Sequence, residues 1–209
     1  MRGQLISFKL LLITDWSRPG CVEIIKAALS AGPGIAVQHR HPGATDRQFY
    51  EEGLRLKDAC GDAPLFINGR LDVAIALDAH LHLTERSLSA ADVRPFLGSR
   101  WLSSACHPGI VSLSPAGERV GERANPDVDL LLVSPVFDPI SKPPERPPLG
   151  AEAFRTFAAS TPIPCFALGG ITAARIPSLK PLAGVAVIGE VMHAQSPAHA
   201  AEALLRALE

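Results

Sequence analysis

Short apolar runs that alternate with helix-like stretches restrict the fold of this 209-residue chain more than any other feature. Eight such runs are rich in Val, Ile, Leu, Phe and Ala along nearly their whole length. Strands that are apolar on both faces are typical of a parallel sheet covered by helices. The runs are Lys9–Thr14, Gly34–Gln38, Leu65–Asn68, Ala79–Leu83, Arg100–Ala105, Val128–Val133, Ile163–Leu168 and Gly184–Ile188.

The stretches between the runs place apolar residues three and four positions apart, which indicates amphipathic helices. Thr45 and Gln48 also predict a capping box at the start of one helix. The alternation of strand and helix predicts a single (β/α)8 TIM-barrel domain over residues 1–209. An open doubly wound sheet is the alternative, but no G-x-G-x-x-G follows the first run. The predicted helices are Pro19–Leu29, Asp46–Ala59, Arg70–Leu77, Ser89–Leu97, Ala153–Ala159, Thr172–Leu179 and Pro197–Leu208.

Composition excludes several classes of protein. Hydrophobic residues make up 47% of the chain, charged residues 20%, and the formal net charge is −1, so we expect neither disorder nor a nucleic-acid partner. No stretch of about 20 apolar residues occurs, so we expect no membrane partner and a cytoplasmic location. The four cysteines form no C-x-x-C, which argues against a zinc ribbon, and Cys106 is expected to be a buried apolar residue.

The proline-rich segment Phe137–Gly150 interrupts the alternation and predicts a long loop after the sixth strand. Active sites of barrels are built from loops at the carboxyl ends of the strands. We therefore interpret this segment as a lid or binding loop, with a simple surface connection as the alternative.

Polar residues at the predicted strand ends suggest a site. Alternation along a strand sends Gln38 and Arg40 to the same face, and a guanidinium there suits a carboxylate or phosphate, although a structural ion pair is the alternative. His107 follows the fifth run and is the best candidate for a general acid or base. Cys106, its neighbour, would point to the opposite face.

Glycines at two further strand ends predict a phosphate site. Gly169 and Gly170 follow the seventh run, and Gly189 follows the eighth. Exposed backbone N–H groups there can bind an anion, and phosphate sites recur at this place in barrels. Lys142 could add a point charge over the same ligand.

His80 and His82 share one face of the fourth run and could ligate a metal ion. A metal-dependent hydrolase would need further ligands at other strand ends. Two buried neutral histidines are the favoured interpretation, and no metal site is predicted.

Several motifs together resemble the thiamine phosphate synthase/TenI family over nearly the full length. They are LLITD at 11–15, Gln38-x-Arg40, INGRLDVAIALDAHLHL at 67–83, the strand end at His107, VSPVF followed by Lys142, and FALGGI at 166–171. The resemblance implies a barrel that binds a phosphorylated thiazole. It implies substrate contacts at Gln38, Arg40, Asn68 and Lys142, and phosphate contacts at Gly169, Gly170 and Gly189.

The chain departs from the family's synthases where these hold Mg²⁺ on a pyrophosphate. Synthases carry Asn-Asp after the third strand, an Asp after the fourth and a Lys beyond the Arg of the second. Here those places read Asn68-Gly69, Ser87 and Pro42. Without carboxylates, Mg²⁺ loses its oxygen ligands, so no cofactor is expected unless the synthase reaction holds.

The lost carboxylates and the Asn-Gly-Arg triplet make the chain more similar to the TenI branch. Thiazole tautomerisation, with His107 carrying the proton and no metal, is therefore the leading hypothesis. One histidine of that branch is replaced by Pro135. The alternatives are a thiamine phosphate synthase with a modified Mg²⁺ site on Glu85 or Asp72, and a non-catalytic homologue that binds the phosphate ligand. A homo-oligomer is left open.

Overall fold

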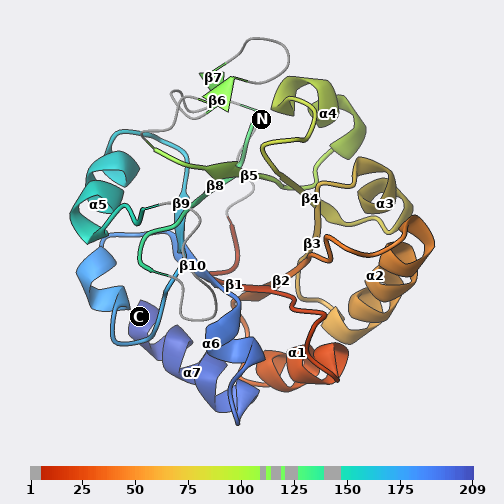
Figure 1. Cartoon of the computed structure of the whole chain (residues 1–209), viewed down its shortest axis with the longest axis horizontal. Helices are drawn as coiled ribbons and strands as arrows, with labels where there is room; N and C mark the ends of the chain where they lie inside the picture. Colours follow the sequence, from red (N-terminus) through yellow and green to blue (C-terminus); the bar gives the residue numbers. More distant parts are fainter. Residues whose placement is uncertain (1–5, 109–111, 114–118, 121–126, 139–146) are drawn as a thin grey trace.

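Eight parallel strands close into a barrel with helices outside it (Figure 1). The structure is a computed structural model that describes residues 6–108, 112–113, 119–120, 127–138 and 147–209. The strand order around the ring is β1-β10-β9-β8-β5-β4-β3-β2, which confirms the predicted (β/α)8 barrel. The strands are β1 (Leu10–Ile13), β2 (Ile35–His39), β3 (Leu65–Asn68), β4 (His80–Leu83), β5 (Leu102–Cys106), β8 (Leu130–Val133), β9 (Cys165–Leu168) and β10 (Gly184–Val187).

The helices follow the strands along the chain and cover the outer face of the barrel (Figure 1). They are α1 (Cys21–Leu29), α2 (Asp46–Cys60), α3 (Leu71–Ala76), α4 (Ala90–Leu97), α5 (Ala151–Ala159), the 3-10 helix η1 (Ile176–Leu179), α6 (Gly189–Met192) and α7 (Pro197–Leu208). Within the described residues, no helix combines the length and the apolar character needed to cross a membrane.

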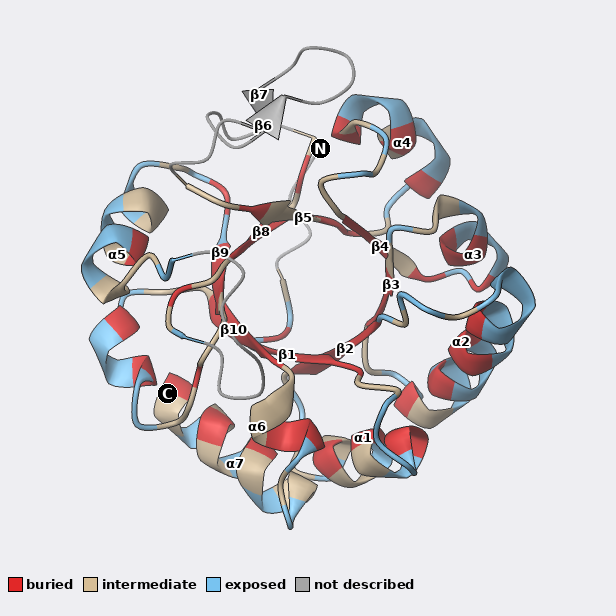
Figure 2. Ribbon diagram, viewed as in Figure 1, coloured by how far each residue is buried: buried red, intermediate tan, exposed pale blue. Residues whose placement is uncertain are grey.

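Successive residues of each strand face alternately into the barrel and toward the helices. Val37 of β2 belongs to the large outer core, whereas Ala36 belongs to a smaller cluster inside the barrel and Gln38 lines its mouth. The strands are buried on both faces (Figure 2). This explains why their sequences read as continuous apolar runs.

Aromatic side chains fill the amino-terminal end of the barrel. The ring centroid of Phe8 lies 5.7 Å from that of Phe66, 5.6 Å from Trp101 and 5.3 Å from Phe166. Aromatic pairs at these distances and tilts are stabilising beyond the area they bury. Because this end is packed, the free space of the barrel lies at the carboxyl ends of the strands.

Three segments differ from the sequence prediction, and one of them is α6, a short helix that no predicted helix covers. The expected helix at Thr172–Leu179 is a turn followed by η1, whose first turn contains Pro177, a residue that cannot supply a helical N–H. The short antiparallel pair β6 (Ser112–Leu113) and β7 (Arg119–Val120), between β5 and β8, was not predicted. Strands of two residues are too short to produce a periodic signal.

The start of α2 forms half of the predicted capping box. The hydroxyl of Thr45 accepts a hydrogen bond from the N–H of Gln48 at 3.3 Å. The Gln48 side chain does not return to Thr45 but donates to Glu52 Oε1 at 2.9 Å. Gln48 therefore helps to hold a carboxylate on the inner face of the helix.

Candidate functional site

A cavity of about 1000 Å³ opens at the carboxyl ends of the strands, and we call it the mouth cavity. Six of the predicted binding or catalytic residues line it, and they come from the ends of β2, β5, β9 and β10: Gln38, Arg40, His107, Gly169, Gly170 and Gly189. Lys142 and most of the predicted Phe137–Gly150 loop lie outside the described residues.

Gln38 forms part of the floor of the mouth cavity and is 1% exposed. Its Nε2 donates to Asn68 Oδ1 at 2.9 Å, while its Oε1 has no hydrogen-bond partner among the described residues. Asn68 does not line the cavity. The structure therefore places Asn68 behind Gln38, where it orients the glutamine amide.

Arg40 leaves the end of β2 with its backbone anchored. Its N–H donates to the Thr14 hydroxyl at 2.9 Å, and that hydroxyl donates to the Arg40 carbonyl at 3.1 Å. No described residue forms an ion pair with the Arg40 guanidinium, so the alternative of a structural ion pair finds no support in the described part of the chain. Arg86, after β4, also lines the cavity.

His107 lies at the end of β5 with both ring nitrogens engaged. Its Nδ1 bonds to the carbonyl of Ser134, and its Nε2 lies 3.1 Å from Glu85 Oε1. A backbone carbonyl only accepts, so Nδ1 carries a proton and Nε2 faces the carboxylate. This arrangement suits proton transfer at Nε2. Its neighbour Cys106 faces the outer core, as predicted, where burial raises the pKa of the thiol to about 12.

His80 and His82 both point into the barrel, one below the other. His80 Nδ1 accepts the N–H of Trp101 at 2.9 Å, and His82 Nδ1 lies 2.9 Å from the Ser103 hydroxyl. Burial lowers the pKa of His80 to about 4 and, with a contribution from Arg40, that of His82 to about 3. The two histidines are therefore neutral and have separate partners.

Gly169 and Gly170 form a corner where the backbone of β9 packs against the loop after β8. Their φ angles are +98° and +60°, which favour glycine. A Cβ on Gly170 would lie 2.3 Å from the carbonyl oxygen of Asp138. The Gly169 carbonyl accepts a hydrogen bond from the N–H of Phe137 at 3.1 Å. The Gly170 carbonyl accepts one from Arg175 Nη1 at 2.6 Å.

The amide side of this corner is the part that can receive an anion. No described residue accepts a hydrogen bond from the N–H of Gly170, and the same holds for Gly189 at the start of α6. Glu190 is the acidic residue nearest to this rim along the chain. Burial raises its pKa, although Arg175 acts in the opposite direction. The three glycines contribute only backbone groups to this rim, and Glu190 lines the cavity beside them.

Two carboxylate–histidine pairs at the mouth were missed by the sequence analysis. His41 Nδ1 lies 2.8 Å from Glu52 Oε2, and His193 Nε2 lies 2.9 Å from Asp15 Oδ2. Burial alone would raise the pKa of Asp15, but hydrogen bonds from Ser17 and His193 lower it overall. Only the position of His41 next to Arg40 could have suggested the first pair, because its partner lies on a helix.

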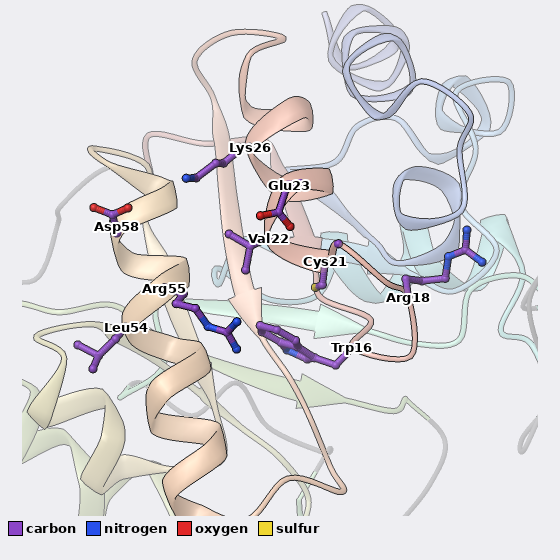
Figure 3. A pocket seen from close by; sticks show the side chains of 10 residues that line it. Trp16, Arg18, Cys21, Val22, Glu23, Lys26, Leu54, Arg55 and Asp58 are labelled. Atoms are coloured by element: carbon purple, nitrogen blue, oxygen red, sulfur yellow. The ribbon is translucent and has the colours of Figure 1, made fainter.

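A second cavity, of about 530 Å³, lies between α1 and α2 on the outside of the barrel (Figure 3). The Arg55 guanidinium lies 5.6 Å from the centre of the Trp16 ring in its wall. Lys26, Glu23 and Asp58 give this wall charges of both signs. None of the predicted site residues lines it, so the mouth cavity is the candidate active site.

Relatives with known names match nearly the whole chain. A family model described as thiamine monophosphate synthase matches residues 10–191. A thiamine-phosphate synthase from Chloroflexus aurantiacus is 32% identical over 97% of this chain and 93% of that protein. One from Salinispora arenicola is 35% identical over 96% and 97%. One from Synechococcus is 34% identical over 88% of this chain, which spans 51% of that relative.

Solved structures agree with these matches. Thiamine phosphate pyrophosphorylase from Pyrococcus furiosus superposes with a TM-score of 0.78 and 28% identity over 96% of this chain and 95% of that one. A 3-hexulose-6-phosphate synthase, with a TM-score of 0.68 and 13% identity, shares the fold alone. The family match over most of the chain, together with these relatives, shows that the chain belongs to the thiamine monophosphate synthase (TMP-TENI) family.

Proposed function

We propose that this protein forms thiamine phosphate by joining hydroxymethylpyrimidine pyrophosphate to a phosphorylated thiazole in the mouth cavity. The observation that carries the proposal is a single cavity with two separate ends suited to anions. Gly170 and Gly189 line the β9–β10 end with backbone amides, while the basic residues Arg40 and Arg86, with His41, line the end toward β2 and β4. A volume of about 1000 Å³ is at the upper end of ordinary ligand sites, as two substrates require.

The names of the relatives support the synthase hypothesis over the tautomerase hypothesis. The sequence alone ranked the thiazole tautomerase first, whereas the relatives described above are named for the synthase. Pro135, in place of a histidine of the tautomerase branch, also lines the mouth cavity and cannot transfer a proton. The synthase therefore replaces the tautomerase as the leading proposal.

The described residues do not fit the paired-carboxylate magnesium site that the family's synthases imply. The corresponding positions are Gly69 and Ser87, and the Ser87 hydroxyl accepts the N–H of Thr84 at 3.0 Å. Asp72, considered as a replacement ligand, is held by Arg70 at 2.9 Å and does not line the cavity.

Glu85, the other replacement considered, is paired with His107. No group of three or more His, Cys, Asp and Glu side chains that could hold a metal ion forms within the described ranges. We therefore propose that protein cations, rather than a protein-bound Mg²⁺, supply most of the positive charge that a pyrophosphate needs.

A coupling assay tests the proposal directly. Purified protein is given both substrates, and thiamine phosphate and released pyrophosphate are measured with and without a chelator. The proposal expects equal amounts of the two products, with activity that persists in the chelator. Tight binding of thiazole phosphate without turnover would instead identify the non-catalytic homologue.

Thiazole tautomerisation is a second candidate because of the His107–Glu85 pair. A histidine with Nδ1 on a carbonyl and Nε2 beside a carboxylate is placed to carry a proton. We expect His107→Asn to slow tautomerisation at least 100-fold, measured with the non-aromatic thiazole phosphate carboxylate, while thiamine phosphate formation changes less than fivefold. Unchanged tautomerisation in this variant would reject His107 as the proton carrier.

A further inference from the structure

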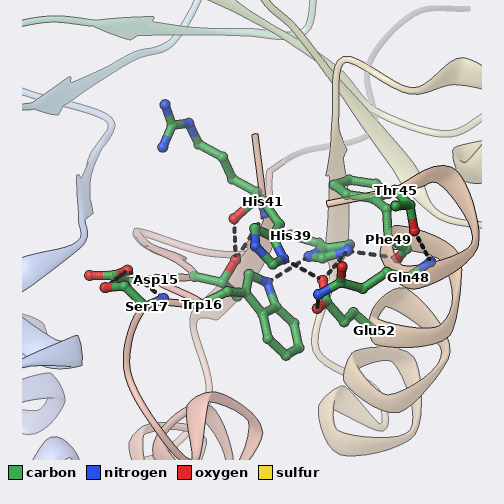
Figure 4. Close-up of polar contacts among 11 residues, drawn as sticks. Asp15, Trp16, Ser17, His39, His41, Thr45, Gln48, Phe49 and Glu52 are labelled. Carbon is green, nitrogen blue, oxygen red and sulfur yellow. Dashed lines mark hydrogen bonds and ion pairs between the residues drawn. The ribbon is translucent and has the colours of Figure 1, made fainter. Parts of the chain in front are cut away.

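His41 stands at the mouth cavity in front of a buried carboxylate (Figure 4). Its Nδ1 lies 2.8 Å from Glu52 Oε2, and the Glu52 side chain is 3% exposed. Glu52 belongs to α2 and does not line the cavity, whereas the imidazole does. The carboxylate is therefore behind the histidine and the cavity in front of it.

An ionised carboxylate at this depth needs a positive or donating partner. Gln48 satisfies Oε1 with a hydrogen bond of 2.9 Å, which leaves Oε2. His39 is 3.9 Å from that oxygen but cannot be the cation. Trp16 Nε1 donates a hydrogen bond to His39 Nδ1 at 3.1 Å, and His39 Nε2 donates to the Phe49 carbonyl at 2.9 Å.

This bonding fixes His39 as a neutral imidazole, and burial lowers its pKa to about 4. Within the described residues, His41 Nδ1 is therefore the one side-chain nitrogen that hydrogen-bonds Glu52 Oε2. Trp16 stacks on the His41 ring with centroids 5.8 Å apart and 10° between the planes, which limits rotation of the imidazole. The position of the His41 ring is thus held by Glu52 and Trp16.

The remaining nitrogen of His41 is the one that can serve a ligand. Nδ1 is taken by Glu52, and no described residue bonds Nε2. The other two histidine pairs of the mouth differ. His107 has both nitrogens engaged, and the carboxylates of Glu85 and Asp15 are 32% and 24% exposed. A buried carboxylate holds its histidine more rigidly and is less screened by water.

We propose that His41, positioned by Glu52, binds the pyrophosphate of the substrate through Nε2 and gives it a proton as it leaves. This inference rests on the proposed synthase function and names the residue that replaces metal charge at the leaving group. A carboxylate that holds Nδ1–H and stabilises the imidazolium is a familiar device for proton transfer at Nε2.

The bond between the pyrimidine methylene carbon and the pyrophosphate oxygen breaks, and its electron pair stays on the oxygen. The thiazole nitrogen uses its lone pair to form the new carbon–nitrogen bond. The proton on His41 Nε2 moves to a pyrophosphate oxygen, and His41 is left neutral with its Nδ1–H on Glu52.

Binding of inorganic pyrophosphate to the full-length protein, measured by calorimetry in excess chelator, tests the contact without catalysis. We expect His41→Gln to weaken binding at least tenfold and Glu52→Gln about threefold. His199→Gln on α7, an exposed histidine remote from the mouth, is the matched control and should change binding less than twofold. Unchanged binding in His41→Gln, or no binding to the wild-type protein, would overturn the inference.

The pH profile of kcat/KM for the pyrophosphate substrate separates a chemical role from a structural one. The charged or titratable groups around His41 are Glu52 from α2, His39 from β2 and Arg40 beside it in the chain. Loss of the carboxylate disfavours the imidazolium, so Glu52→Gln should move the alkaline limb to lower pH. If Glu52→Gln unfolds in urea like the wild type and the alkaline limb of its kcat/KM profile does not move, Glu52 does not position His41 for proton transfer.

The two proposals fail separately. A wild-type protein that binds pyrophosphate through His41 but forms no thiamine phosphate would refute the synthase function and leave the His41 contact standing. A protein that forms thiamine phosphate at the wild-type rate after His41→Gln would refute the contact and leave the synthase function standing.

Discussion

The two ends of the mouth cavity are built from different parts of the chain. At β9 and β10 the rim includes the backbone amides of a glycine corner, whereas at β2 and β4 it is built from side chains, among them the basic residues Arg40 and Arg86. Backbone amides bind an anion through fixed geometry, with little adjustment available. Side chains bind through charge, which salt screens and substitution can tune. Substitutions can thus alter the side-chain contacts at β2 and β4 while the backbone contacts at the glycine corner stay unchanged.

The largest loss of activity is expected from Gly170→Ala, which changes the glycine corner at the β9–β10 end. The new Cβ would lie 2.3 Å from the Asp138 carbonyl oxygen at a φ of +60°. We expect a loss of about 2 kcal/mol in the free energy of unfolding and at least a 100-fold loss of kcat/KM. Urea unfolding and the coupling assay measure the two effects.

Gly98→Ala is the matched control for this change. Gly98 has a φ of +56°, but nothing lies within 4 Å of its Cβ position. It carries the same backbone strain without the collision, so its kcat/KM should stay within twofold of the wild type. Equal activity losses in the two variants would show that strain alone, and not the corner, is responsible.

A smaller effect is expected from Arg40→Gln at the side-chain end. Loss of one charge-assisted contact should raise KM for the pyrophosphate substrate about 30-fold. Arg40→Lys should recover part of this, and the wild-type KM should rise with salt more steeply than that of Arg40→Gln. Identical salt dependence in wild type and variant would argue that Arg40 does not meet the anion. Arg206→Gln on α7 is the exposed control.

The smallest expected effect is on the pH dependence of stability, and it comes from His82, which lines the mouth cavity near Arg40. Burial lowers the pKa of His82 to about 3, from the ordinary 6.5. The unfolded chain then binds more protons below pH 6.5, so the stability from neutral His82 is complete above that pH and is lost as the pH falls toward 3. His82→Asn should reduce the slope of unfolding free energy between pH 6.5 and 5 by at most about 1.4 kcal/mol per pH unit.

Urea unfolding at several pH values measures this slope. His199→Asn, on an exposed helix face, should leave it unchanged. Equal slopes in wild type and His82→Asn would mean that His82 is not held neutral, and the cationic end would then have a charged floor.

Much of the fold could be predicted because strand signals in a parallel barrel are strong and local. Each predicted run overlaps its strand, and the ends differ by at most two residues, as in β5 and β9. The same alternation placed Gln38 and Arg40 on one wall, and the glycines after β9 and β10 on the other. The helix predicted at Thr172–Leu179 does not form over its whole length, because Pro177 has no N–H to continue a helix from the preceding turn.

The site itself was only partly predictable. Gln38, Arg40 and His107 stand at strand ends, where the topology makes position readable from sequence. Asn68 stands at a strand end as well, yet packing places it behind Gln38. His41 was missed because the property that matters, a buried carboxylate behind it, belongs to α2.

The sequence by itself determined that eight strands alternate with helices and which strand residues share a face, because the alternation of side chains along a strand is a property of neighbouring residues. Only the tertiary structure decided which side chains meet at the mouth. His193 and Asp15 pair across 178 positions, and His107 meets Glu85 through the adjacent strands β5 and β4. Closing the ring brings strand ends together regardless of their separation in the chain, so these partners are set by ring geometry and not by spacing.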